Sequence, residues 1–382
     1  MNQLKVMTVF GTRPDAVKMA PLVKELEKSA LIDQKVCVTA QHRQMLDQVL
    51  GIFDIKPHYD LNIMQDRQTL EHITIRALEG VAGVLDAGKP DVVLVHGDTS
   101  TCFVAALAAF YRQIPVGHVE AGLRTFDKYF PYPEEMNRKL AASLAEYHFA
   151  PTAANKSNLL REGVRPDRIY ITGNTVIDAL KTTVRSDYAF EDEILKKIDL
   201  TGKRVIAVTA HRRENLGAPL ENICRALKDI ACNYPDTAVI YAVHLNPAVR
   251  ETAWKILDGQ ERVHLIDPLG VQDMHNLMDR SYMVLTDSGG LQEEAPSLGK
   301  PVLVLRNETE RPEAVQAGTV KLAGTGRDRV YALAAQLLDE PEEYTKMARA
   351  VNPYGDGLAS ARIVKALLYE FGLGGEKPGE FK

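Results

Sequence analysis

Three acidic residues in the first half of the chain are placed where carboxylates could move protons. Asp98 and Glu120 come shortly after two apolar runs, at residues 91–95 and 115–119, and Glu134 falls in the first turn of a predicted helix after a proline-rich stretch. Parallel strands end at one edge of a sheet, so Asp98 and Glu120 should share a rim. Each residue alone fits a role as a helix-dipole partner. Three carboxylates on one rim favour acid–base chemistry.

A second set of residues could hold an anion. The apolar run 283–286 is followed by the letters DSGG and then by a predicted helix that begins LQEEA. Two glycines before a helix let backbone N–H groups approach a ligand closely, and the helix start adds partial positive charge. We expect Ser288, Gly289 and Gly290 to contact a phosphate and Glu294 to face a sugar hydroxyl. A plain strand-to-helix turn with a serine cap is the alternative that this stretch leaves open.

Cationic and imidazole side chains at other predicted strand ends could complete such a site. Arg13 follows the apolar run 4–10, and His211 and His244 end two runs in the second half of the chain. In open parallel sheets, ligands bind outside the carboxyl ends of the strands. Taken singly, each of these residues also fits an ordinary surface arginine or a hydrogen-bonded histidine.

The elements that position these residues alternate between strands and helices. Short apolar runs followed by amphipathic stretches recur in two series, which is typical of parallel sheets. A chain of 382 residues also exceeds a usual single core. We therefore predict an α/β protein with two doubly wound, Rossmann-like domains that face a cleft. The stretch Gly173-Asn174-Thr175 is predicted to be the crossing, so the first domain covers residues 1–172.

Composition excludes several classes of protein. The net charge is −5, whereas nucleic-acid binding needs clustered Lys and Arg. The apolar run near the start has only the length of a strand, so it predicts neither a signal peptide nor a membrane span. We expect a cytoplasmic protein that contacts neither nucleic acid nor membrane. The four cysteines include no C-x-x-C pair, which favours reduced, buried thiols.

Motifs for common cofactors are missing from the sequence. It contains no G-x-x-x-x-G-K-[ST], no G-x-G-x-x-G after the first apolar run, no D-x-D and no H-E-x-x-H. We therefore expect no cofactor and no metal. If the protein cleaves a sugar–phosphate bond, cationic side chains and a helix start must stabilise the leaving group.

With these features in view, the chain resembles the non-hydrolysing UDP-N-acetylglucosamine 2-epimerases. The resemblance rests on motifs that occur in order along nearly the whole chain. They are VFGTRP at 9–14, VTAQHRQMLDQVL at 38–50, VLVHGDTST at 93–101, VGHVEAGLRT at 116–125, PYPEEMNR at 131–138, ITGNTVIDAL at 171–180, AHRREN at 210–215, TDSGGLQEEAPSLGKPV at 286–302 and NPYGDG at 352–357.

The resemblance implies a fold and an activity. The fold is the two-domain GT-B type, with a second, UDP-binding domain at 173–361 and a final helix within 362–382 that crosses back to the first domain. The activity is that of an isomerase that interconverts UDP-GlcNAc and UDP-ManNAc through elimination of UDP to 2-acetamidoglucal and readdition. The resemblance also implies allosteric activation by a second UDP-GlcNAc, a homodimer, and a supply of ManNAc for cell-surface polysaccharide.

Site residues follow from the same resemblance. The catalytic set is Asp98, Glu120, Glu134 and His211. The set that binds the UDP-sugar substrate is Arg13, Lys18, His211, Ser288, Gly289, Gly290 and Glu294. The set that binds the activator is Gln41, Gln44, Arg67, Glu134, Arg212 and His244. Without the resemblance, Gln41, Gln44 and Arg67 would be taken as ordinary surface residues.

Some positions depart from the family pattern. Asp15 stands where Glu is usual, Met274 replaces a usual Phe near the uracil, and Asn307-Glu308 replaces a usual Asp-Thr pair. None is a predicted catalytic carboxylate. Three alternatives remain: a hydrolysing epimerase that releases free ManNAc, a GT-B glycosyltransferase, and a regulator that binds nucleotide sugars without chemistry. The letters QHRQ and AHRREN, together with Arg67, favour the non-hydrolysing kind.

Overall fold

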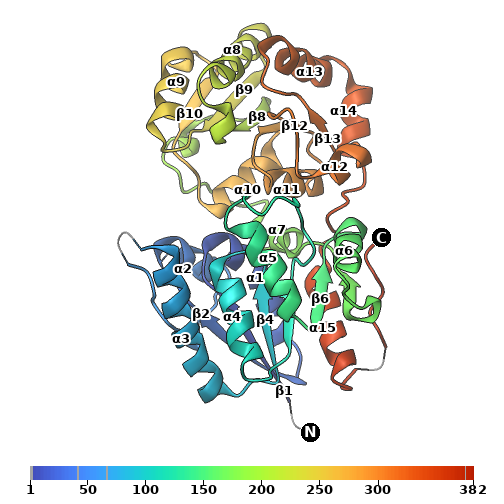
Figure 1. Ribbon diagram of the computed structural model, residues 1–382. Coiled ribbons are helices and arrows are strands. Elements are labelled where there is room, and N and C mark those ends of the chain that lie inside the picture. Colours follow the sequence, from blue (N-terminus) through green and yellow to red (C-terminus); the bar gives the residue numbers. More distant parts are fainter. Residues whose placement is uncertain (1–2, 41–42, 66–67, 375) are drawn as a thin grey trace. The chain divides into compact units, whose positions relative to one another are not determined.

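The computed structural model describes residues 3–40, 43–65, 68–374 and 376–382. The chain forms two compact units, one made of Met1–Thr182 and Tyr354–Lys382 and the other of Thr183–Pro353. In each unit, helices flank one parallel sheet (Figure 1). The predicted α/β class with two doubly wound sheets is therefore confirmed.

The sheet of the first unit has seven strands in the order β3-β2-β1-β4-β5-β6-β7. The strands are β1 (Leu4–Phe10), β2 (Ile32–Val38), β3 (Tyr59–Asp60), β4 (Val92–His96), β5 (Val116–Val119), β6 (Tyr147–Ala150) and β7 (Ile169–Ile171). The helices are α1 (Arg13–Glu27), α2 (Arg43–Ile52), α3 (Leu70–Gly88), α4 (Ser100–Phe110), α5 (Glu134–Leu144), α6 (Ala153–Arg161), α7 (Thr175–Thr183) and α15 (Ala359–Glu370). Central parallel strands are covered on both faces, which explains why their sequences are almost continuously apolar.

The sheet of the second unit has six strands in the order β10-β9-β8-β11-β12-β13. The strands are β8 (Arg204–Thr209), β9 (Thr237–Ala242), β10 (Val263–Ile266), β11 (Met283–Thr286), β12 (Val302–Val304) and β13 (Val320–Leu322). The helices are α8 (Ala218–Asn233), α9 (Pro247–Leu257), α10 (Val271–Arg280), α11 (Leu291–Ser297), α12 (Pro312–Ala317), α13 (Arg327–Asp339) and α14 (Pro341–Ala348).

Apolar faces of the helices form the cores on the sheets. In the first unit, Val81 of α3 and Ala105 of α4 lie fully buried in one cluster with Val9 and Val95 of the central strands. In the second unit, α8, α9 and α13 bury their apolar faces in one cluster with β8, β9, β11 and β12. These cores fix the strand ends on which the candidate site residues lie.

Each sheet has a point where the strand order reverses. In the first sheet it lies between β1 and β4, and in the second between β8 and β11. Ligands of open parallel sheets bind at such a point, outside the carboxyl ends of the strands. The segments that leave these strands are residues 11–13, 97–99, 210–212 and 287–289. They contain six of the predicted site residues: Arg13, Asp98, His211, Arg212, Ser288 and Gly289.

The boundary between the units differs from the predicted crossing at residue 173. Helix α7 and the segment from Tyr354 onward belong to the first unit. The backbone N–H of Asn174 donates to the Tyr354 carbonyl at 2.6 Å. The buried Asp178 carboxylate accepts from the backbone N–H of Ala359 at 3.2 Å and of Ser360 at 2.8 Å. These bonds tie α7 to the start of α15, and α15 packs against α1.

The cysteines fit their prediction with one exception. Cys37, Cys102 and Cys224 are buried free thiols, and burial raises the pKa of Cys37 and of Cys224 to about 12. Cys232 is also a free thiol but is exposed, because it lies on the outward side of α8 rather than on its apolar face. Among the described helices, none is long and apolar enough to cross a membrane.

Candidate functional site

Glu120 is the most closely held of the predicted carboxylates. It follows β5 directly, is only 9% exposed, and has a backbone φ of +62°, which is uncommon for a side chain of this kind. Its Oε2 forms an ion pair with the Lys18 ammonium and accepts a hydrogen bond from Asn174 Nδ2 at 2.8 Å. Strained backbone of this sort persists where surrounding contacts hold it, and it clusters at functional sites.

Asp98 and Glu134 are tied together through helix α5. Asp98 lies just beyond β4, and its carboxylate forms an ion pair with Arg138 of α5. Its carbonyl accepts from Asn137 Nδ2 at 2.9 Å. Glu134 is the first residue of the same helix, and its Oε2 is buried without a hydrogen-bond partner among the described residues. A Cβ added at Gly97, the residue before Asp98, would lie 3.7 Å from Glu120 Oε1, so Asp98 and Glu120 lie at one rim.

The loop before α5 is held by the neighbouring Glu135. This carboxylate is fully buried and accepts from the backbone N–H groups of Thr125 and Phe126, each at 3.1 Å. It also lies 3.5 Å from Arg138 Nη1. Glu135 therefore fixes the start of α5, and with it Glu134, by a structural role that the sequence did not reveal.

Asp287 organises the candidate site of the second unit. It is fully buried at the end of β11, and its Oδ2 accepts from the backbone N–H of His211 at 2.7 Å, from that of Arg212 at 2.8 Å and from Asn215 Nδ2 at 2.9 Å. Arg212 Nε also donates to the Asp287 carbonyl at 3.3 Å. A buried carboxylate needs such donors. It thereby joins the loop after β8 to the turn that carries Ser288.

The His211 imidazole stacks on that of His244. The ring centroids are 5.2 Å apart and the planes differ by 10°. His211 Nδ1 also lies 3.3 Å from Asp287 Oδ1. The pKa of His211 is lowered, chiefly by burial and further by His244 and Arg212, while Asp287 opposes the shift. The structure thus places His211, Arg212 and His244, three predicted site residues, next to one another.

The turn after β11 leads into the short helix α11. Ser288 N donates to Thr286 Oγ1 at 2.9 Å, and Gly290 has helical backbone angles, with φ −62°. A Cβ added at Gly290 would lie 3.2 Å from Glu294 Oε1, and one at Gly289 would lie 3.8 Å from Arg311 Nη2. A side chain at Gly290 would therefore crowd Glu294, whereas one at Gly289 would make an ordinary contact, and neither glycine has a left-handed φ.

Glu294 lies at one end of a buried polar chain. Its Oε2 is 3.2 Å from His275 Nε2, and His275 Nδ1 is 2.6 Å from Thr183 Oγ1. His275 and Thr183 are both buried. They fix the orientation of the Glu294 carboxylate, and nothing in the local sequence spacing predicted them.

The remaining predicted residues are less closely connected. Arg13 begins α1 and is partly exposed, and Gln44 is exposed on α2. Gln41 and Arg67 lie outside the described residues. The structure therefore brings Lys18, Asp98, Glu120 and Glu134 together in the first unit. It brings His211, Arg212, His244, Ser288, Gly289, Gly290 and Glu294 together in the second.

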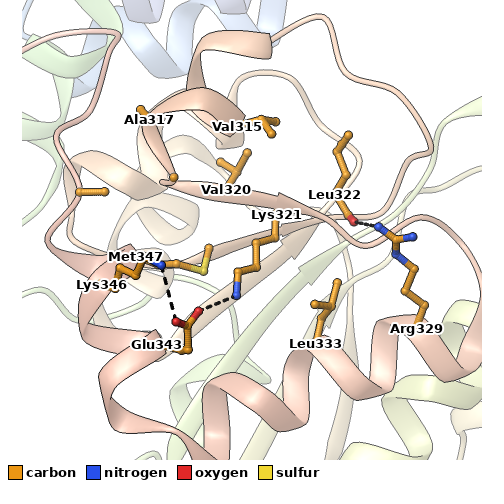
Figure 2. A pocket seen from close by; sticks show the side chains of 12 residues that line it. Val315, Ala317, Val320, Lys321, Leu322, Arg329, Leu333, Glu343, Lys346 and Met347 are labelled. Atoms are coloured by element: carbon orange, nitrogen blue, oxygen red, sulfur yellow. Dashed lines mark hydrogen bonds and ion pairs between the residues drawn. The ribbon is translucent and has the colours of Figure 1, made fainter.

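A separate cavity of about 470 Å³ lies beside the edge strand β13 (Figure 2). Two lysines that line the cavity are paired with one carboxylate, because Glu343 lies 3.0 Å from Lys321 Nζ and 3.7 Å from Lys346 Nζ. Arg329 Nη2 donates to the Leu322 carbonyl at 3.0 Å. Among the described residues that line this cavity, none is a predicted site residue.

Comparison with known proteins is consistent with this geometry. The family model described as UDP-N-acetylglucosamine 2-epimerase matches residues 24–368. The UDP-N-acetylglucosamine 2-epimerase of Bacillus subtilis is 59% identical over 382 residues, which cover 100% of this chain and 99% of the relative. The S. aureus MnaA-UDP co-structure superposes with a TM-score of 0.90 at 52% identity and covers 100% of both chains.

A structure with the nucleotide sugar is also similar. UDP-GlcNAc 2-epimerase from Neisseria meningitidis, bound to UDP-GlcNAc, has a TM-score of 0.85 and 51% identity, covering 96% of this chain and 100% of that one. The two doubly wound parallel sheets and the similarity to solved epimerase structures over nearly the whole chain define an α/β fold of the GT-B type. The chain belongs to the UDP-N-acetylglucosamine 2-epimerase family. It is an isomerase, as predicted.

Proposed function

We propose that this chain catalyses reversible epimerisation at C2 of UDP-GlcNAc to give UDP-ManNAc. The observation that carries the proposal is the Glu120 carboxylate, buried at the rim of the first sheet beside Asp98 and contacted by Lys18 and Asn174. A carboxylate so placed is suited to take a proton from a bound sugar. The family and the nucleotides bound by similar proteins support the choice of substrate.

The chemistry proposed is elimination followed by readdition. The C2 proton of the sugar is barely acidic in the ground state. When the C1–O bond to UDP breaks, positive charge grows at C1 and the C2 proton becomes easier to remove. The intermediate is 2-acetamidoglucal with UDP, and protonation from the opposite face gives the manno sugar. Acid–base groups are needed on both faces of the ring, and Asp98, Glu120 and Glu134 supply them in this proposal.

The leaving diphosphate needs preorganised positive charge. We assign this role to Arg13, Lys18 and His211, together with the backbone at residues 288–290, because donors aimed at developing charge lower the barrier. Glu294, oriented by His275, is assigned to a sugar hydroxyl of the nucleotide. No cofactor or metal takes part in this scheme.

Activation by a second UDP-GlcNAc is also proposed. Gln41, Gln44, Arg67, Glu134, Arg212 and His244 would contact it. An activator shifts the equilibrium between two states of an enzyme only if it binds one state more tightly than the other. In this proposal it favours the active state, in which water is excluded from the charged sugar. The resemblance to the family supports this assignment, a homodimer, and a role in supplying ManNAc for cell-surface polysaccharide.

Product analysis tests the activity. Purified protein is incubated with UDP-GlcNAc alone, and nucleotides and free sugars are separated over time. UDP-ManNAc in equilibrium with UDP-GlcNAc is the expected result. Accumulation of free ManNAc with UDP would instead identify a hydrolysing enzyme, and an unchanged substrate with measurable binding would identify a regulator or an acceptor-dependent transferase.

A further inference from the structure

The imidazole of His96 lies between two buried carboxylates at the end of β4. Its Nδ1 is 3.8 Å from Asp15 Oδ1, and its Nε2 is 3.9 Å from Glu120 Oε2. The side chain is only 3% exposed. Among the described residues, neither ring nitrogen has a hydrogen-bond partner. Buried polar atoms are nearly always paired in folded proteins, so two such atoms on one ring need an explanation.

Asp15 presents one carboxylate oxygen to the Nδ1 edge of His96. Its Oδ2 accepts from the Thr12 backbone N–H at 3.3 Å and from Thr99 Oγ1 at 3.1 Å, while its Oδ1 faces His96. An ionised carboxylate only accepts hydrogen bonds, and a neutral imidazole has one N–H and one acceptor nitrogen. With the hydrogen on Nδ1, the N–H of a neutral ring would point to Asp15, and Nε2 would face Glu120 with its lone pair.

Glu120 meets a different kind of partner on each side. Lys18 and Asn174 donate to its Oε2, which stabilises the ionised form. The lone pair of His96 Nε2 suits the protonated form instead. A shift of about 1 Å would bring Nε2 and Oε2 into hydrogen-bond range. An acid–base group must be stabilised in both of its protonation states, and these partners provide for each.

We propose that His96 is a positioning residue that accepts a hydrogen bond from protonated Glu120, with Asp15 holding its tautomer. The proposal rests on the proposed function, in which Glu120 removes the C2 proton. In that step the C–H bond breaks, its electron pair forms the C1–C2 double bond, and UDP leaves with the C1–O pair. The proton stays on Glu120 as O–H···Nε2, and His96 gains none.

Two other groups face this cluster. Lys18 reaches Glu120 from α1, and His118 of β5 holds the carbonyl of Gly97 through its Nε2 at 2.8 Å. The bond to Gly97 fixes the backbone directly after His96. The His96 ring thus has a fixed backbone anchor, with one edge facing Asp15 and the other facing Glu120.

Two substitutions of His96 test the role by kinetics. Asn ends near the position of Nδ1 and cannot reach Glu120, whereas the amide oxygen of Gln can accept from protonated Glu120 near the position of Nε2. We expect His96→Asn to lower kcat about 10- to 100-fold with little change in UDP-GlcNAc affinity, and His96→Gln to restore much of that loss. Wild-type kcat in His96→Asn, or equal losses in both variants with normal nucleotide binding, would overturn the proposal.

A second readout does not depend on activity. Nitrogen-15 NMR of labelled histidine gives the tautomer of His96, whose signal is assigned by its absence in His96→Gln. We expect hydrogen on Nδ1 in the wild type and in Asp15→Glu. In Asp15→Asn the amide can donate to Nδ1, so hydrogen should move to Nε2. Hydrogen on Nε2 in the wild type would refute the role of Asp15. Absence of epimerisation in the wild type would refute the proposed function but would not affect the result on the tautomer of His96.

Discussion

The ammonium group of Lys18 forms an ion pair with the carboxylate of Glu120, joining the first helix to the end of the fifth strand. The two side chains are 18% and 8% exposed. Such a pair is costly to break from one side, because the remaining charge stays buried without its partner. The pair also brings a cation to the rim where we propose that UDP departs.

Replacement of Lys18 by Met should therefore lower both stability and turnover. We expect the free energy of unfolding to fall by about 1–3 kcal/mol, since Asn174 still donates to Glu120, and kcat to fall with it. Urea unfolding followed by circular dichroism measures the first effect. Lys24→Met is the matched control on the same helix, because its pair with Glu27 is 35% and 43% exposed and should contribute less than about 1 kcal/mol. Equal losses in the two variants would contradict the importance of the buried pair.

The three rim carboxylates should each be needed for turnover. Asp98→Asn, Glu120→Gln and Glu134→Gln should each lower kcat roughly 100-fold or more if these groups move protons. Steady-state rates at saturating UDP-GlcNAc provide the measurement. Asp91→Asn is a control at the opposite end of β4, where the carboxylate accepts from Lys5 N at 2.8 Å, and it should leave kcat near the wild-type value. A residue whose variant turns over normally has no part in proton transfer.

Asp287 should matter for UDP binding through the loop that it holds. Asp287→Ala removes the acceptor for three donors, which should lower the free energy of unfolding of the second unit by about 2–4 kcal/mol and weaken UDP binding. Asp287→Asn keeps an oxygen toward those donors and should lose less. Fluorescence of Trp254, the chain's single tryptophan, reports unfolding of this unit, and calorimetry reports UDP affinity. Unchanged UDP affinity in Asp287→Ala would exclude this loop from the nucleotide site.

Two buried histidines should make the first unit sensitive to acid. Burial lowers the pKa of His118 to about 3 and, together with Arg124, that of His148 to about 4. Below their unfolded value of about 6.5, the unfolded chain binds protons at these histidines and the native state does not. The full contribution of these histidines to the free energy of unfolding is present above about pH 6.5. It is lost as the pH falls from there toward 4 for His148 and toward 3 for His118, by up to about 1.4 kcal/mol per pH unit for each histidine.

Urea unfolding at pH 7, 6 and 5 checks this dependence. His118→Gln, whose amide can still donate to the Gly97 carbonyl, removes one titrating group and should flatten the slope. A slope that is the same in wild type and His118→Gln would show that His118 does not contribute.

Much of the fold could be predicted from the sequence because the central strands are buried on both faces. The apolar run that became β1 needed no tertiary information. The two-residue β3 and the three-residue β13 could not be predicted, since edge strands this short carry little apolar pattern. The crossing near residue 173 was misplaced because the bond between Asn174 and Tyr354 joins segments that are remote in sequence.

Part of the candidate site could likewise be predicted from the sequence, and part could not. Strand ends placed Asp98 and Glu120 on one rim, because the geometry of a parallel sheet fixes such positions. The partners Arg138 and Asn174 come from other elements, and their contacts depend on packing. Asp287 was passed over because an Asp before Ser and two glycines looks like an ordinary turn residue, although its carboxylate holds the loop of His211.

The most direct test of the account is a proton NMR time course with UDP-GlcNAc and the purified protein in D2O, without added NAD or metal. If Glu120 and its neighbours act by elimination and readdition, UDP-ManNAc appears with deuterium at C2, and the UDP-GlcNAc pool loses its C2 proton as equilibrium is reached. Formation of UDP-ManNAc that keeps the original C2 proton would contradict proton removal by these carboxylates.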